Sequence, residues 1–161
     1  MTTHSHMNTP STSMNHYRRL LVMVLASFVA MYGLMYAMVN RFENVFNNVN
    51  QVYMATLMTA SMVIIELALM WRMYYNTKRN VVIVAAAVVA LLASWVFIRR
   101  QTGIGDREFL RSMIPHHAGA ILMCGEAPIR DSEIKALCQE IITGQQREIE
   151  QMKTMLQRLS R

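Results

Sequence analysis

Charged residues are scarce in this chain, and long stretches contain none. Of the 161 residues, only 16% are Asp, Glu, Lys or Arg, whereas 53% are hydrophobic. The hydrophobic residues lie in three long blocks, whereas a soluble helical domain would interleave charges every few residues. The scarcity of charge therefore argues against a soluble protein and favours insertion into a membrane.

Cysteine is also scarce. The chain has two, Cys124 and Cys138, separated by thirteen residues. Without a CxxC pair, the sequence supports neither a zinc ribbon nor a thioredoxin-like motif. In an oxidising compartment these two residues could form a disulfide, within one chain or between two.

The net charge of +6 does not predict nucleic-acid binding. Most basic residues flank the apolar blocks, where they meet lipid headgroups, and they form no basic face interleaved with aromatic residues. These flanking residues are Arg18, Arg19, Arg72, Lys78, Arg79, Arg99 and Arg100.

The apolar blocks predict three transmembrane helices after a polar N-terminal tail, residues 1–19. The first block covers residues 20–39, the second residues 52–75 and the third residues 81–98. At 1.5 Å per residue, each apolar block reaches roughly 27 to 30 Å or more, enough to cross a bilayer core. Residues 20–99 are therefore expected to anchor the protein in a lipid bilayer.

The distribution of Lys and Arg sets the expected orientation. Arg18 and Arg19 precede the first helix, which usually dominates topology. We therefore expect the N-terminus in the cytoplasm and the C-terminal domain outside it, as in a bacterial inner-membrane protein with a periplasmic domain. The margin between the sides is five basic residues (18, 19, 72, 78 and 79) against four (41, 99, 100 and 107).

Glu66 and the methionines are the unusual features of the membrane region. Glu66 lies in the middle of the second predicted helix, where it either lines a metal or proton path or fixes helix packing. The chain has 16 methionines, and the third predicted helix has none. Methionine packs well as a flexible gap-filler, but its thioether is also a soft ligand for Cu(I). Both interpretations remain open.

Residues 100–105 predict a hinge, and residues 106–161 a helical hairpin. Asp106 is expected to cap the first helix, whose apolar face includes Phe109 and His117, and Pro115 is expected to kink it. Residues 125–130 predict the turn, and a second helix follows from about Asp131 to Leu159. A turn centred near residue 127 or 128 sets His117 level with Cys138. Cys124 then lies about two turns out of level with Cys138, which disfavours a disulfide within the chain.

A single hairpin of this size cannot enclose its own apolar stripe. We therefore expect it to pair with a second copy as a dimer, making a four-helix bundle with metal sites between facing helices. The predicted fold class is all-α.

The run Asp106-x-x-Phe109-x-x-x-Met113-Ile114-Pro115-His116-His117 resembles the domain-of-unknown-function 305 family, as does the later Gln145-x-x-Glu148-Ile149-x-x-Met152. The resemblance covers about residues 106–157. It implies a ferritin-like helical fold and, in members with an assigned role, copper binding outside the cytoplasm. The metal ligand candidates that it implies are Met113, His116, His117, Met123 and Met152. Many members have four helices, whereas this chain has one hairpin, and the family supplies no role for Cys124 or Cys138.

The residue types themselves favour a soft metal. On a helix, Met113 lies within one turn of His116 and His117, so a thioether and an imidazole can reach one ion. That pair suits Cu(I) better than Zn(II), Mg(II) or Ca(II). Gln145 or Glu148 is expected to hold an imidazole N–H from outside the site, and the competing interpretation is a polar core cluster with His117 bonded to Gln145.

The function expected from these residues is membrane-anchored copper binding outside the cytoplasm, for sequestration, tolerance or hand-over. The alternative is a structural protein whose hairpin oligomerises or docks a partner without metal. The hairpin has no Glu-x-x-His pair, no paired carboxylates and no nucleophile–base arrangement, so we do not expect an enzyme.

Overall fold

The computed structural model describes residues 10–160, which contain helices and turns and no strand. The prediction of an all-α fold is confirmed. The main helices are α1 (Pro10–Leu34), α2 (Val49–Leu69), α3 (Thr77–Arg100), α4 (Asp106–Glu126) and α5 (Ser132–Arg158). Two short 3-10 helices, η1 (Met35–Met38) and η2 (Phe42–Asn44), lie in the connection between α1 and α2.

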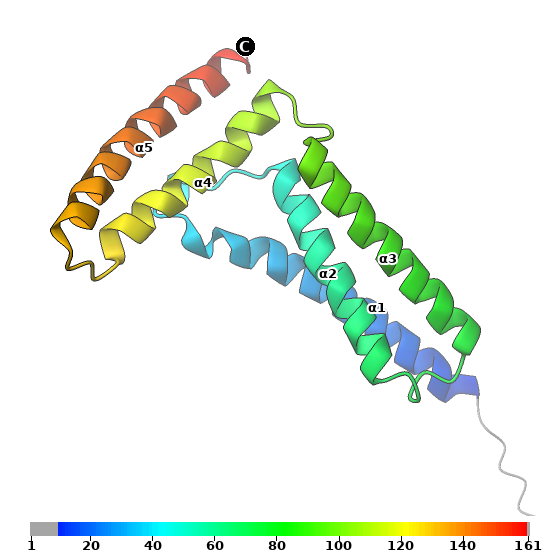
Figure 1. The fold of residues 1–161 in the computed structure, drawn as a ribbon. Helices are drawn as coiled ribbons and strands as arrows, with labels where there is room; N and C mark the ends of the chain where they lie inside the picture. Colours follow the sequence, from blue (N-terminus) through cyan, green and yellow to red (C-terminus); the bar gives the residue numbers. More distant parts are fainter. Residues whose placement is uncertain (1–9, 161) are drawn as a thin grey trace, which may run out of the picture.

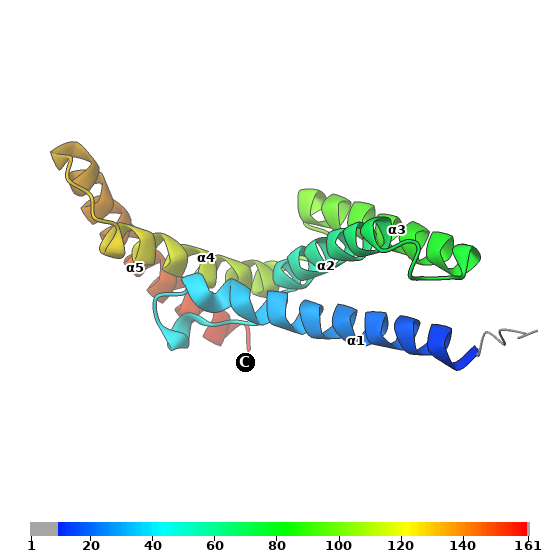
Figure 2. The same cartoon turned by 90° about the horizontal axis from the view of Figure 1, so that it is seen from below.

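Helices α1 to α3 form one region, and α4 and α5 form a hairpin at one end of it (Figure 1). Helix α2 packs against both α1 and α3. Figure 2 shows the hairpin beside the end where α1 stops and α2 starts. Three helices are long and apolar enough to cross a membrane, with candidate spans His16–Met38, Val49–Leu69 and Thr77–Arg100.

Asparagine side chains start two of these helices. Asn48 accepts a hydrogen bond from the backbone N–H of Gln51 at the start of α2. Asn76 accepts one from Arg79 at the start of α3. Each side chain satisfies a backbone donor that has no partner within the helix. The first helix includes described residues from Pro10 onward, and so reaches well before the predicted apolar block.

The predicted position of Glu66 in mid-helix is wrong. Helix α2 ends at Leu69, so Glu66 lies in its last turn, where its carbonyl accepts from the N–H of Met70. Residues 70–76 form the connection to α3. A carboxylate near a helix end costs less to insert than one at the bilayer centre, because water and headgroups are within reach.

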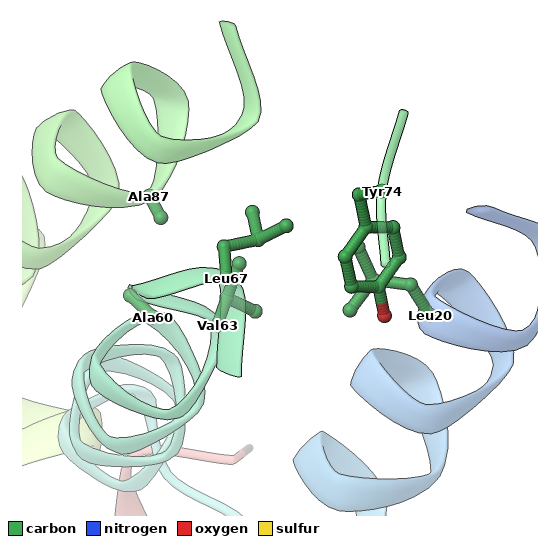
Figure 3. Packing of buried hydrophobic residues seen from close by; sticks show 6 residues of the cluster. All are labelled: Leu20, Ala60, Val63, Leu67, Tyr74 and Ala87. Atoms are coloured by element: carbon green, nitrogen blue, oxygen red, sulfur yellow. The ribbon is translucent and has the colours of Figure 1, made fainter. Parts of the chain in front are cut away.

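Helices α1 to α3, called the membrane region here because they contain the three candidate spans, have a small apolar core between them (Figure 3). Leu67 is fully buried and points from α2 into the space between α3 and the Tyr74–Leu20 pair. Ala60 and Ala87 are small enough to let α2 and α3 approach each other. Most of the remaining apolar surface of these helices faces outward, which is the pattern expected of helices solvated by lipid.

Polar side chains form a hydrogen-bonded cluster at the end of the membrane region that lies far from the hairpin. Asn80 is fully buried and donates to the carbonyl of Tyr74 at 2.8 Å. Its Oδ1 accepts from the hydroxyl of Tyr17 at 2.7 Å. Because Tyr17 belongs to α1 and Asn80 to α3, this cluster ties the first and third helices together across the connection after α2.

The hairpin differs from its prediction at the start of α4 and in the residues of its buried face. Gly105 is the residue before α4, and Asp106 is the first helical residue, where its charge faces the positive end of the helix dipole. Helix α4 continues through Pro115 without a break. Its buried face contains Leu110, Ile114, His117 and Ala118, whereas Phe109 is half exposed.

Removal of the Tyr17 hydroxyl tests the polar cluster. In Tyr17→Phe, the buried Oδ1 of Asn80 loses its donor, which should destabilise the protein by about 1–3 kcal/mol. We expect a lower midpoint for thermal unfolding in detergent micelles. Tyr75→Phe is the matched control because Tyr75 is 78% exposed. Equal midpoints for the two variants would contradict the role of the cluster.

Tyr74 gives a second test, in alkaline solution. Burial raises the pKa of Tyr74 above its usual value of about 10, and the negative charge of Glu66 adds to the rise. The stability linked to this group is present below the usual pKa and is lost as pH rises through the raised one. We therefore expect the late-titrating part of the tyrosinate absorbance at 295 nm to fall by the amount of one tyrosine in Tyr74→Phe.

The Glu66→Gln variant should move that late titration toward lower pH, because it removes the nearby negative charge. An unchanged titration would show that the charge of Glu66 does not affect the pKa of Tyr74.

Candidate metal-binding groove

The two adjacent histidines of α4 point to different sides of the helix. Successive helical residues are about 100° apart around the axis, so neighbours cannot share one narrow face. The rings of His116 and His117 have centroids 6.1 Å apart at an interplanar angle of 63°. His116 is exposed, whereas His117 is only 9% exposed.

His117 faces α5, and both of its ring nitrogens have partners. Nδ1 lies 2.9 Å from the carbonyl oxygen of Met113, which only accepts, so Nδ1 donates. Nε2 lies 2.9 Å from Oε2 of Glu148. One proton must lie between those two atoms, on the imidazole or on the carboxyl group, because two lone pairs would repel each other. The ring is thus fixed between α4 and α5.

Of the two residues expected to hold an imidazole, Gln145 and Glu148, it is Glu148 that bonds to the ring of His117. The other, Gln145, does not bond to His117. Its Oε1 is buried and has no hydrogen-bond partner among the described residues.

His116 lies on a different side of α4, in a groove of about 480 Å³ between the hairpin and the membrane region. Met113 and Met123 line this groove from the same helix. Three further methionines line it from the membrane region, Met35 and Met38 from η1 and Met54 from α2. One imidazole and five thioethers thus border a single hollow.

The structure divides the five predicted ligands between two places. Met113, His116 and Met123 line the groove. Met152 is buried in the core of the hairpin, and His117 is bonded to Glu148. Met113 borders both regions, because it lines the groove and also packs against the hairpin core.

The sequence did not predict that side chains of η1 and α2 line this groove. Met35, Met38 and Met54 carried a general signal, an excess of methionine, but nothing local linked them to His116. Their association with the hairpin depends on how the chain folds back after the hinge. The packing of α4 on both η1 and α2 brings these side chains together.

Gly119 of α4 lies close to the backbone of Met38 in η1. A Cβ atom built on Gly119 would lie 3.5 Å from the carbonyl oxygen of Met38 and 3.9 Å from its Cβ. A methyl group fits at those distances, but a larger side chain does not. Nearby, the backbone N–H of Val49 donates to Oε2 of Glu108 at 3.3 Å. These contacts hold the groove closed on one side.

The predicted register of the hairpin is wrong. Helix α4 extends to Glu126, and residues 127–131 form the loop. Ala127 and Asp131 are both extended, so the loop carries the chain beyond the end of α4 before α5 starts. Each residue of α4 therefore meets a later residue of α5. His117 meets Glu148 and not Cys138, which lies ten positions earlier.

The corrected register brings the two cysteines together. The Sγ atoms of Cys124 and Cys138 are 2.7 Å apart, and both residues are reduced in this structure. The expectation that they lie two turns out of level is therefore wrong. The hydrogen bond between the sulfurs, together with burial, raises the pKa of the Cys124 thiol above its usual value.

The donor set determines which metals the groove suits. Within residues 10–160, no three His, Cys, Asp or Glu side chains come close enough to hold a metal ion without other ligands. A metal here would need thioether sulfur, which suits Cu(I) and is poor for Zn(II), Mg(II) and Ca(II). The thioether and imidazole donors of the groove fit a soft monovalent cation.

Comparison with known proteins gives two similarities. The family described as Domain of unknown function (DUF305) matches residues 99–159, which cover the hairpin. The chain is 35% identical over 140 residues to Uncharacterized protein L153 of Acanthamoeba polyphaga mimivirus, with 85% of this chain and 90% of the relative covered. That similarity reaches well into the apolar helices. No solved structure matches the chain.

Substitution of Gly119 tests whether the hairpin is seated as described. Gly119→Ala should be tolerated, because its methyl group fits, and should even favour the helix by up to about 1 kcal/mol. Gly119→Leu should push α4 away from Met38 at a cost of about 1–3 kcal/mol. We expect faster tryptic cleavage after the exposed Arg41 in the leucine variant only. Equal cleavage of both variants would contradict the contact.

Proposed function

Because this chain belongs to the DUF305 family, a domain family of unknown function, we propose its function from the donor atoms that the fold brings together: it is a membrane-anchored protein that binds copper as Cu(I). The observation that supports this proposal is the groove, in which His116 lies among five methionines from η1, α2 and α4. Methionine is an ordinary packing residue, but a purely structural cluster would not need an imidazole at its border.

The chemistry of the donors selects the ion. Thioether sulfur and neutral imidazole are soft or intermediate ligands that stabilise Cu(I), whereas hard cations require carboxylate or carbonyl oxygen. We assign Met113, His116 and Met123 as the ligand candidates from the hairpin. We assign Met38 and Met54 as candidates from the membrane region, with Met35 beside them.

His117 and Met152 then support the groove from behind. The bond of His117 to the Met113 carbonyl orients the imidazole within α4, and its bond to Glu148 fixes the rotation of α4 relative to α5. Met152 fills the core beneath that contact. The rotation of α4 sets where Met113 and His116 point, so these residues act on the metal through packing and not by direct contact.

The groove lies at the adjoining ends of two of the three candidate spans, His16–Met38 and Val49–Leu69, where a membrane-bound protein would meet water. The arginine pair in the first turns of the first span, Arg18 and Arg19, favours a hairpin outside the cytoplasm. A copper ion bound there would be kept at the membrane surface, for sequestration, tolerance or hand-over to another carrier. Open thioether sites suit hand-over, because each weak Cu–S bond can be exchanged separately.

The hairpin also presents unpaired apolar side chains. Ile134 and Leu137 of α5 are 49% and 54% exposed. Pairing of two hairpins into a four-helix bundle would cover them. This surface equally favours a second candidate function, an interaction protein whose hairpin oligomerises or docks a membrane partner without metal. An identical oligomer with and without copper, and no copper in elemental analysis, would select that candidate.

Competition titration with a Cu(I) chelator tests the copper proposal in the full-length protein in detergent under anaerobic conditions. His116→Ala and Met54→Leu should each weaken Cu(I) binding by about tenfold or more, since even residues that only support a ligand cost 10–100-fold. Leucine keeps the size of methionine and removes only the sulfur.

Met58→Leu is the matched control, because Met58 lies one turn from Met54 on α2 and does not line the groove. Its Cu(I) affinity should equal that of the wild type. If Met54→Leu and Met58→Leu bind Cu(I) alike, or if protein from copper-fed cells contains no copper, the groove is not a copper site.

A further inference from the structure

The two cysteines form a separate feature at the tip of the hairpin. Cys124 lies in the last turn of α4 and Cys138 in the second turn of α5. Their sulfur atoms are 2.7 Å apart, and neither residue is among the described residues that line the groove. Nothing in the proposed copper chemistry uses them.

We propose that Cys124 and Cys138 are an oxidisable dithiol that forms a disulfide within one chain. The sulfurs of a disulfide are 2.03–2.05 Å apart, so a contact of 2.7 Å needs only a small further approach. The loop residues 127–131 and the cap of Asp131 on α5 hold the two helices in this register. The thiols are therefore placed by the fold and do not meet by chance collision.

A bond within one chain is favoured over a bond between two chains. Cys138 is buried against α4, so a second protein molecule has little access to its sulfur. Cys124 is partly exposed and is the thiol that a small reagent reaches first. Its nearest thiol is already Cys138 of the same chain.

Thiol–disulfide exchange with a small-molecule disulfide completes the reaction. The Cys124 thiolate attacks one sulfur of the reagent, and the other half leaves as a thiolate. The Cys138 thiolate then attacks the Cys124 sulfur of this mixed disulfide and releases the second half. The protein loses two protons and two electrons, and the small disulfide is reduced to two thiols.

The disulfide would staple the end of the hairpin. It closes a loop of 15 residues, from Cys124 to Cys138, and so restricts the unfolded chain. Met123 directly precedes Cys124 and lines the groove, so the disulfide would also restrict the position of Met123. The bond forms whether or not the groove binds copper.

Peptide mapping of the full-length protein in detergent tests the proposal. Reduced protein is equilibrated with mixtures of reduced and oxidised glutathione, quenched by alkylation and digested with trypsin without reduction. We expect peptides 112–130 and 136–147 to appear as one linked species that lacks two hydrogens, from protein that runs as a monomer on a non-reducing gel. Oxidation should also raise the unfolding midpoint, by on the order of 5 °C or more.

Cys124→Ser and Cys138→Ser are the control variants. Each should show no linked peptides and no rise in the unfolding midpoint under the same oxidising mixture. Thiols that stay alkylated at the most oxidising ratio, a persistent glutathione adduct in the wild type, or a disulfide-linked dimer would each overturn the proposal. These results do not depend on Cu(I) affinity, so the failure of one proposal is distinguishable from the failure of the other.

Discussion

The groove exists only while α4 lies against the segment that follows α1. The backbone of Gly119 approaches Met38, and Val39 and Phe46 pack against the core of the hairpin. The Lys153–Glu43 pair across the same junction contributes little, because its atoms are 3.8 Å apart and Glu43 is exposed, a class of ion pair worth at most about 1 kcal/mol. Apolar packing, the small Gly119 and the bond from the Val49 N–H to Glu108 therefore decide whether the methionines of the two regions face each other.

Two adjacent histidines acquire different roles because of helix geometry alone. His117 lies on the side of α4 that faces α5, where Glu148 and a backbone carbonyl occupy both of its nitrogens. His116 lies on the side that faces the membrane helices, where the groove leaves its imidazole accessible. In this short motif, His117 therefore fixes the helix pair, and His116 is available to a ligand.

Local pattern was enough to predict the elements of this fold. A helix that crosses a bilayer needs only a long apolar run without charges, and residues 81–98 and their two counterparts have that property. The hinge near Gly103 and the hairpin after it followed from glycine punctuation and 3.6-residue periodicity. Met113 and His116 could be paired as candidate ligands because one helical turn separates them. All of these features depend on residues close together in sequence.

Only the tertiary structure determined how α4 and α5 align and which distant side chains meet. The conformation of five loop residues shifted α5 along α4, which brought Cys124 to Cys138 and gave His117 a carboxylate partner. Packing after the hinge joined Met38 and Met54 to His116 across more than sixty residues of chain. Periodicity indicates which face of a helix is apolar, but it does not indicate which other helix packs against that face. That choice is made by the summed packing of distant segments, so the amino-acid sequence alone supplied the donor atoms and the fold selected which of them share a groove.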